Sequence, residues 1–193
     1  MSQNVVGLIL AAGRSTRMGE ANKLLTPFRS KPLLHHVLDA ANASRLARTI
    51  VVTGHDREKI EALVGDRAVL AHNADYANGM AGSLRNGIYR MQGKYPVLVM
   101  LGDMPLIDGV LINRMLDAFE KHDQSAIVVA THDGRWGNPV LFGTDYFAAL
   151  KMLDGDEGAR SIIRAHRSKV VEVDTGSAAA IDLDTPEAFR EHL

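Results

Sequence analysis

The feature that most restricts the fold of this chain is an apolar run that ends in very small residues. Val5-Val6-Gly7-Leu8-Ile9-Leu10 is continuously apolar and is followed by Ala11-Ala12-Gly13, where no side chain is larger than a methyl group. Such a run is typical of a strand that is covered on both faces, as in a parallel sheet. The small residues at its carboxyl end let a ligand approach the backbone, whose amides can hold an anion.

Positive charge follows this predicted strand. Arg17 and Lys23 lie in the next ten residues, and fixed charge beside backbone amides suits a triphosphate. The stretch matches neither the G-x-G-x-x-G pattern nor the G-K-[ST] ending of a P-loop. From these residues alone, an ordinary strand-to-loop connection with solvated charges stays open as the alternative.

Strand and helix patterns then alternate. Residues 32–41 carry apolar side chains at helical spacing, and residues 49–54 and 68–71 read as strands. Between these strands, Asp56 is expected to cap a helix that runs to Leu63. This β-α-β-α order predicts an α/β fold with a mostly parallel sheet.

Composition restricts the class of protein further. With 193 residues, 46% of them hydrophobic, we expect a single domain over residues 1–193. A net charge of −1 does not favour nucleic acid or an anionic membrane as partner, and the lack of cysteine excludes disulfides and thiolate metal sites. No apolar stretch approaches the ~20 residues that span a bilayer, so we expect a cytoplasmic protein.

The most apolar run, residues 95–101, ends in Gly102-Asp103-Met104-Pro105. Open α/β sheets bind ligands at the carboxyl ends of their strands, and Asp103 would lie at such an end. Asp108 is better placed to cap the helix that follows, which leaves the Asp103 carboxylate available. Mg²⁺ is usually held by one or two carboxylates together with substrate phosphate. Asp103 is therefore the expected metal ligand, with Mg²⁺ as cofactor and Mn²⁺ also suited to oxygen ligands.

Three later segments are candidates for ligand contacts. Residues 72–85 hold glycines and short polar side chains between a strand and a helix, which is typical of a functional loop or of a helix cap with a glycine hinge. Residues 133–142 form a turn and a short strand, in which Trp136, the only tryptophan, either shields a substrate or packs in the core. Asp156 is expected to be an N-cap, and Arg160 in that helix could hold an acceptor phosphate.

Longer patterns carry a family resemblance. L-A-A-G-x-S-x-R-M-G at residues 10–19, followed by N-K-L-L at 22–25, resembles the signature of the MobA-like NTP transferases, the group of the molybdenum cofactor cytidylyl- and guanylyltransferases. The motifs N-x-x-Y-x-x-G-x-x-x-S-L-R, L-G-D-x-P and G-D-x-G-A-R occur in register further along. The resemblance extends from Gly7 through Glu187.

The resemblance implies a fold and a set of site residues. The fold is a three-layer α-β-α domain with a mostly parallel, Rossmann-like sheet of the nucleotide-diphospho-sugar transferase type. Asp103 and, on a late strand, Asp182 would bind the metal, while Asn138, where the family often has histidine, and Arg160 would face the acceptor. The residues expected to bind the nucleotide are Leu10, Ala11, Ala12, Gly13, Arg17, Lys23, Asn73, Gly79 and Ser83, of which Arg17 and Lys23 act with Asp103 in catalysis.

The implied reaction transfers a nucleoside monophosphate from an NTP to a phosphorylated acceptor and releases pyrophosphate. The guanylyl branch typically reads L-A-G-G where this chain has Leu10-Ala11-Ala12-Gly13, and a methyl at position 12 would narrow the base pocket in favour of CTP. The implied acceptor is molybdenum-bound molybdopterin, with possible docking to a molybdoenzyme. A sugar- or alcohol-phosphate nucleotidyltransferase and a nucleotide-binding cofactor chaperone without turnover stay open as alternatives.

Overall fold

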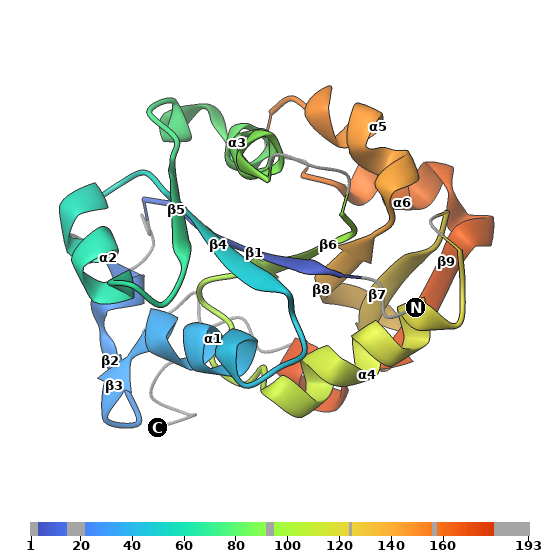
Figure 1. Ribbon diagram of the computed structural model, residues 1–193, viewed down its shortest axis with the longest axis horizontal. Helices are drawn as coiled ribbons and strands as arrows, with labels where there is room; N and C mark the ends of the chain where they lie inside the picture. Colours follow the sequence, from blue (N-terminus) through green and yellow to red (C-terminus); the bar gives the residue numbers. More distant parts are fainter. Residues whose placement is uncertain (1–3, 15–21, 92–94, 124, 156–157, 180–193) are drawn as a thin grey trace.

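A computed structural model of the protein describes residues 4–14, 22–91, 95–123, 125–155 and 158–179. In this part of the chain, seven strands form one sheet in the order β5-β4-β1-β6-β8-β7-β9 (Figure 1). Strand β8 is antiparallel to both of its neighbours, and the other pairs are parallel. The strands of this sheet are β1 (Val6–Ala11), β4 (Arg48–Thr53), β5 (Val69–His72), β6 (Val97–Leu101), β7 (Ile127–His132), β8 (Arg135–Phe142) and β9 (Val170–Asp174).

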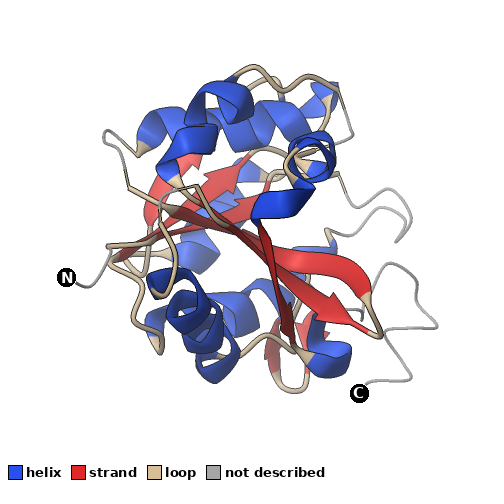
Figure 2. Ribbon diagram, turned by 90° about the vertical axis from the view of Figure 1, so that its right-hand side faces the viewer, coloured by secondary structure: helices blue, strands red, loops and turns tan. Residues whose placement is uncertain are grey.

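Helices cover both faces of this sheet, so the described chain has the predicted three layers (Figures 1 and 2). Alternate strand residues enter opposite cores: Ile9 and Val51 pack with α1, α2 and α4, while Leu8 and Val52 pack on the face of α3, α5 and α6. This follows from the two-residue period of a strand. The helices are α1 (Leu33–Asn42), α2 (Arg57–Val64), α3 (Met80–Arg90), α4 (Gly109–Glu120), α5 (Phe147–Lys151) and α6 (Arg160–Ala165). The α/β prediction is confirmed.

The strand order creates a crevice between β1 and β6. From β1 the chain proceeds through α1 to β4 and through α2 to β5, then returns through α3 to β6 on the other side of β1. Because such crossovers are right-handed, reversing the direction moves the connecting helix to the opposite face of the sheet. The loops after β1 and β6 therefore diverge, and ligands of open α/β sheets bind at this switch point.

Strand β8 is longer than the sequence indicated. Asp133 and Gly134, with φ of 49° and 70°, form a two-residue turn that reverses the chain from β7 into the eight residues of β8. Positive φ at both positions is typical of the hairpin turn that matches strand twist. Pairing with β6 ends where Val99 meets Val140, and both Asn138 and Leu101, which lie beyond that pair, line one cavity.

One predicted helix cap is confirmed and one is only partly so. Asp108 caps α4, because its Oδ1 accepts from the Leu111 amide at 2.7 Å. Asp56 is in the predicted N-cap position of α2, but it has a left-handed φ of 50° and makes no side-chain capping hydrogen bond; its carboxylate accepts from Lys59 instead. Helix α6 begins at Arg160 with Ala159 in the N-cap position, and Asp156 lies outside the described residues.

Short 3₁₀ helices and a small hairpin complete the described chain. None of its helices is long and apolar enough to cross a membrane. The hairpin consists of β2 (Pro27–Phe28) and β3 (Lys31–Pro32). The 3₁₀ helices are η2 (Lys23–Leu25), η3 (Tyr76–Asn78), η4 (Thr144–Tyr146), η5 (Arg167–Lys169) and η6 (Gly176–Ala179).

Candidate functional site

The carboxyl ends of β1 and β6 lie side by side at this switch point. Leu10 pairs with Leu101, and the Gly102 amide donates to the Leu10 carbonyl at 3.0 Å. A Cβ at Gly102 would lie 3.2 Å from that carbonyl oxygen, so the close approach of the two strands favours glycine here. A Cβ at Gly13 would have no described atom within 4 Å, which leaves the first loop open to a ligand.

Lys23 and Asp103 form an ion pair in this mouth. Lys23 Nζ lies 3.1 Å from Asp103 Oδ2, although the two residues are 80 positions apart in the sequence. The lysine side chain is 3% exposed and the carboxylate 24%, so the lysine approaches from inside the protein and the carboxylate faces the opening. The Asn22 side chain accepts from the Leu24 amide at 3.1 Å and so begins the short helix that carries Lys23.

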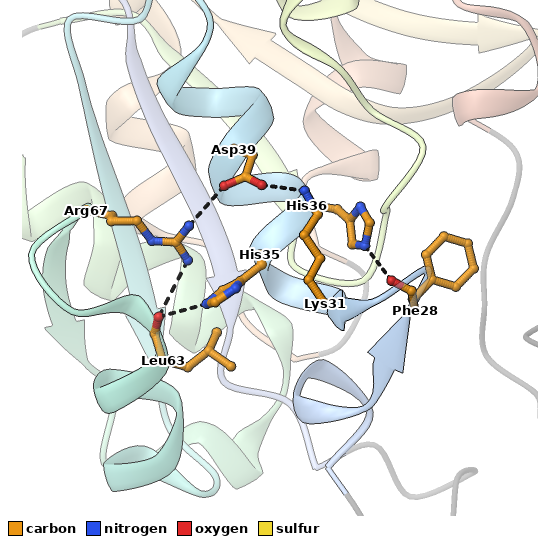
Figure 3. Close-up of polar contacts among 7 residues, drawn as sticks. All are labelled: Phe28, Lys31, His35, His36, Asp39, Leu63 and Arg67. Atoms are coloured by element: carbon orange, nitrogen blue, oxygen red, sulfur yellow. Dashed lines mark hydrogen bonds and ion pairs between the residues drawn. The ribbon is translucent and has the colours of Figure 1, made fainter. Parts of the chain in front are cut away.

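The hairpin after Lys23 is fixed to α1 by a polar cluster (Figure 3). His36 Nε2 lies 2.8 Å from the carbonyl oxygen of Phe28, whose ring is fully buried. Asp39 accepts from Lys31 and, at 2.9 Å, from Arg67. Its partial burial raises the carboxyl pKa, but the hydrogen bond and charge of Lys31 and the charge of Arg67 outweigh this and hold the pKa below its ordinary value.

The two adjacent histidines of α1 point to different partners. His35 Nε2 lies 3.0 Å from the Leu63 carbonyl oxygen, whereas His36 contacts Phe28 (Figure 3). Burial lowers the pKa of His36, despite the opposing effect of its hydrogen bond to the Phe28 carbonyl. The pair is therefore a structural link between α1 and its neighbours, and the two rings do not share a ligand.

Two of the residues predicted to bind the nucleotide, Asn73 and Ser83, are hydrogen-bonded to each other. Asn73 Nδ2 donates to Ser83 Oγ at 3.1 Å, and Asn73 Oδ1 accepts from the Asp75 amide at 3.1 Å. Both Asn73 and Ser83 are 5% exposed. Gly79, with a φ of 102°, links η3 to α3 in a conformation that favours glycine. These contacts tie the loop to the end of β5 and to the first turns of α3.

Tyr76 lies against the first loop, a contact that the sequence did not reveal. A Cβ at Gly54 would be 2.6 Å from Tyr76 Cβ and 2.8 Å from Ala12 Cβ, so both side chains pack on the backbone at the end of β4. Ala12 is 3% exposed. The Arg14 guanidinium lies 5.6 Å from the Tyr76 ring centroid, and the His55 ring lies 5.9 Å from it. The Ala12 methyl is thus backed by an aromatic side chain.

A cavity of about 670 Å³ opens on the α3 and α6 face of the sheet, next to this mouth. Both predicted acceptor residues, Asn138 and Arg160, line it together with Leu10 at the end of β1. Arg164 also lines it. It lies four positions after Arg160 and therefore on the same face of the helix, a spacing from which it could have been predicted. Trp136 is half-buried, lines the cavity and packs against the edge of the core, and its shielding of a substrate stays a prediction.

A preformed cluster of metal ligands is absent from the described residues. They contain no group of three or more histidine, aspartate or glutamate side chains close enough to share a metal ion. A carboxylate has about four lone-pair sites, of which the Lys23 ammonium takes one on Asp103, so this side chain retains capacity for a cation that also binds substrate phosphates. Arg17 and Asp182 lie outside the described residues, and their predicted roles stay predictions.

Comparison with known proteins adds independent information. A family model described as the MobA-like NTP transferase domain matches residues 7–170. The crystal structure of Rv0371c from Mycobacterium tuberculosis H37Rv superposes with a TM-score of 0.85 at 26% identity, covering 100% of this chain and 98% of that one. A manganese complex of Rv0371c matches with a TM-score of 0.83 at 27% identity, covering 99% and 98% of the two chains.

A curated relative shares one region with this chain. The bifunctional protein GlmU of Burkholderia thailandensis is 33% identical over 174 residues, which are 90% of this chain and 37% of that protein. The chain thus spans little more than a third of the length of that relative.

Proposed function

The chain belongs to the MobA-like NTP transferase family of nucleotidyltransferases, and we propose that it transfers a cytidylyl group from CTP to the phosphate of molybdenum-bound molybdopterin. An oxygen of the acceptor phosphate attacks the α-phosphorus of CTP, and the bond from that phosphorus to the pyrophosphate oxygen breaks. The products are molybdopterin cytosine dinucleotide and pyrophosphate, formed in the cytoplasm. The observation that carries this proposal is the Lys23–Asp103 ion pair beside the open backbone of the first loop.

The main obstacle to this reaction is repulsion between two anions, so positioning and charge neutralisation supply most of the rate. Lys23 carries a positive charge that its neighbours hold in place, and Arg17 is proposed to add a second. Asp103 would hold a divalent cation, Mg²⁺ or Mn²⁺, which offsets charge on the phosphates when bound. The manganese complex of Rv0371c supports this choice of cofactor.

The nucleotide is proposed to lie over Leu10, Ala11, Ala12 and Gly13, with the loop between Asn73 and Ser83 closing over base and ribose. The preference for a pyrimidine rests on the alanine at position 12, where the guanylyl branch typically has glycine. One methyl discriminates by only about 1–3 kcal/mol, so we expect CTP to exceed GTP in kcat/KM by roughly 10- to 200-fold.

The acceptor is proposed to occupy the cavity that Asn138 and Arg160 line, with its phosphate directed to the mouth at Leu10. Arg160 would hold the acceptor phosphate through charge-assisted hydrogen bonds. A molybdoenzyme that receives the finished cofactor is the proposed docking partner. A sugar-phosphate acceptor stays the second candidate, which the same assay separates.

The test is release of pyrophosphate from CTP, with Mg²⁺ and molybdenum-bound molybdopterin present, compared with the same assay using GTP or sugar phosphates. Asp103→Asn keeps the shape of the side chain but removes its charge, and we expect kcat to fall by about 10²–10³-fold or more. Asp108→Asn is the matched control, because asparagine caps helices about as well as aspartate. It should keep both stability and activity.

Each outcome separates the candidates. Faster turnover with GTP than with CTP would defeat the base assignment, and pyrophosphate release with a sugar phosphate alone would defeat the acceptor assignment. Tight CTP binding without turnover of any acceptor would favour a nucleotide-binding chaperone. Full activity of Asp103→Asn would remove the basis of the metal proposal.

A further inference from the structure

We infer that the Trp136 indole is a stacking platform that selects acceptors with a planar ring system and a phosphate over sugar phosphates. The inference rests on the proposed function, since it names the class of molecule that the acceptor cavity takes. It extends that proposal to a specificity-determining residue, Trp136, and to two residues that position it, Glu172 and Arg167.

A hydrogen bond fixes the direction of the indole. Trp136 Nε1 donates to Glu172 Oε1 at 2.7 Å. Trp136 is on β8 and Glu172 is on β9, and β7 lies between these two strands. The two backbones are therefore separated by about 9.5 Å, twice the spacing of neighbouring strands. To span this distance, the indole must extend across the sheet face over β7.

The Arg167 side chain makes a cation–π contact with the Trp136 ring. The Arg167 guanidinium carbon lies 5.4 Å from the Trp136 ring centroid, a distance at which a cation is attracted to an aromatic face. Arg167 comes from η5, immediately before β9, so it is anchored to the same strand as Glu172. Neither Arg167 nor Glu172 lines the cavity, whereas Trp136 does. The part of the indole that faces the cavity is thus distinct from the parts held by these two residues.

The other residues that line the cavity provide apolar walls and two positive charges, which suit a planar ring and an anion. Its walls include the aliphatic side chains of Leu84, Val99 and Val140, while Arg160 and Arg164 add positive charge from one face of α6. None of the described residues that line it carries a carboxylate. A sugar has several hydroxyl groups, each of which loses free energy when it is buried without a hydrogen-bond partner. A planar ring buries apolar faces on such walls and on the indole without this cost.

The experiment measures binding of a phosphorylated pterin, 6-hydroxymethylpterin phosphate, in the absence of nucleotide and metal. Glucose 1-phosphate and inorganic phosphate are the comparison probes. Isothermal titration gives the Kd, and because the chain has one tryptophan, a ¹H–¹⁵N spectrum contains one indole N–H resonance that reports on Trp136 directly. We expect the pterin phosphate to bind more tightly than either comparison probe and to shift this resonance.

Variants separate stacking from general packing. Trp136→Leu should weaken pterin phosphate binding by roughly 5- to 150-fold, the range for loss of one aromatic stack, while Trp136→Phe should keep most of it. Glu172→Ala should weaken binding less, and Glu172→Gln should restore it, because its amide oxygen can accept the indole hydrogen bond. Tyr89→Leu is the matched control, since Tyr89 also has a cation over its ring, Lys151 at 5.3 Å, but does not line the cavity.

Unchanged pterin phosphate affinity in both Trp136→Leu and Glu172→Ala would overturn the inference, as would an equal or higher affinity for glucose 1-phosphate. The circular dichroism and Tm of each variant establish that it is folded. Failure of the wild-type protein to turn over CTP would refute the proposed function instead, and leaves the binding result for Trp136 as it stands.

Discussion

The Asn73–Ser83 hydrogen bond allows a quantitative prediction for the loop that is proposed to close over the nucleotide. Ser83→Ala removes the Oγ that accepts from Asn73 Nδ2 and changes little else, since the side chain is 5% exposed. The amide of Asn73 is buried as well and still binds the Asp75 amide through its oxygen, so its nitrogen is left without the serine acceptor.

The magnitude follows from the burial of that donor. A buried donor that loses its acceptor costs about 1–3 kcal/mol, more than the hydrogen bond itself contributes. For a chain of this size, about 2 kcal/mol lowers Tm by roughly 4–8 °C. Because Asn73 anchors the loop, we also expect a weaker Kd for CTP with a smaller effect on kcat.

Urea unfolding and CTP titration measure these two effects. Gly82→Ala, in the same turn of α3, is the control, since its Cβ would lie in ordinary contact with Asn73 Nδ2 at 3.6 Å. This control should be neutral or up to about 1 kcal/mol more stable, because alanine is the better helix former. A Ser83→Ala free energy of unfolding within about 0.5 kcal/mol of wild type, the range of a surface substitution, would refute the reasoning.

Three further predictions use other contacts. Gly87→Ala, whose Cβ would lie 2.3 Å from the Cδ1 atom of fully buried Leu8, should destabilise the protein by about 1–3 kcal/mol in urea unfolding, opposite in sign to an alanine at position 82. The free energy of unfolding should fall as the pH is lowered through 6.5, because the lowered pKa of His36 means that the folded state binds this proton less readily than the unfolded state. His36→Gln should lose that part of the pH dependence. A pH profile of His36→Gln identical to that of the wild type would contradict the prediction. Arg160→Ala should raise the KM for the acceptor by roughly 10- to 150-fold, the value of a charge-assisted hydrogen bond, and should leave the Kd for CTP unchanged. An unaltered acceptor KM would count against a role of Arg160 in binding the acceptor phosphate.

Local patterns were sufficient to predict an α/β fold with a mostly parallel sheet. Continuous apolar runs predicted β1, β4 and β6, because strands covered by helices on both faces leave no polar side. The capping of α4 by Asp108 was equally predictable, since a cap depends on residues only three positions apart. The glycine-rich loop and Asp103 were predicted to bind ligand from their places at the ends of strands, and this stays a prediction.

Contacts between distant segments could be decided only by the tertiary structure. Lys23 meets Asp103 because right-handed crossovers place β6 beside β1, and no local period encodes that strand order. In the same way, Trp136 reaches Glu172 because β8 enters the sheet antiparallel and β7 lies between the two strands. The sequence by itself determined which residues face inward and which end a strand. The packing of the sheet determined which of those ends meet, because the free energy of strand pairing and helix burial depends on the whole chain.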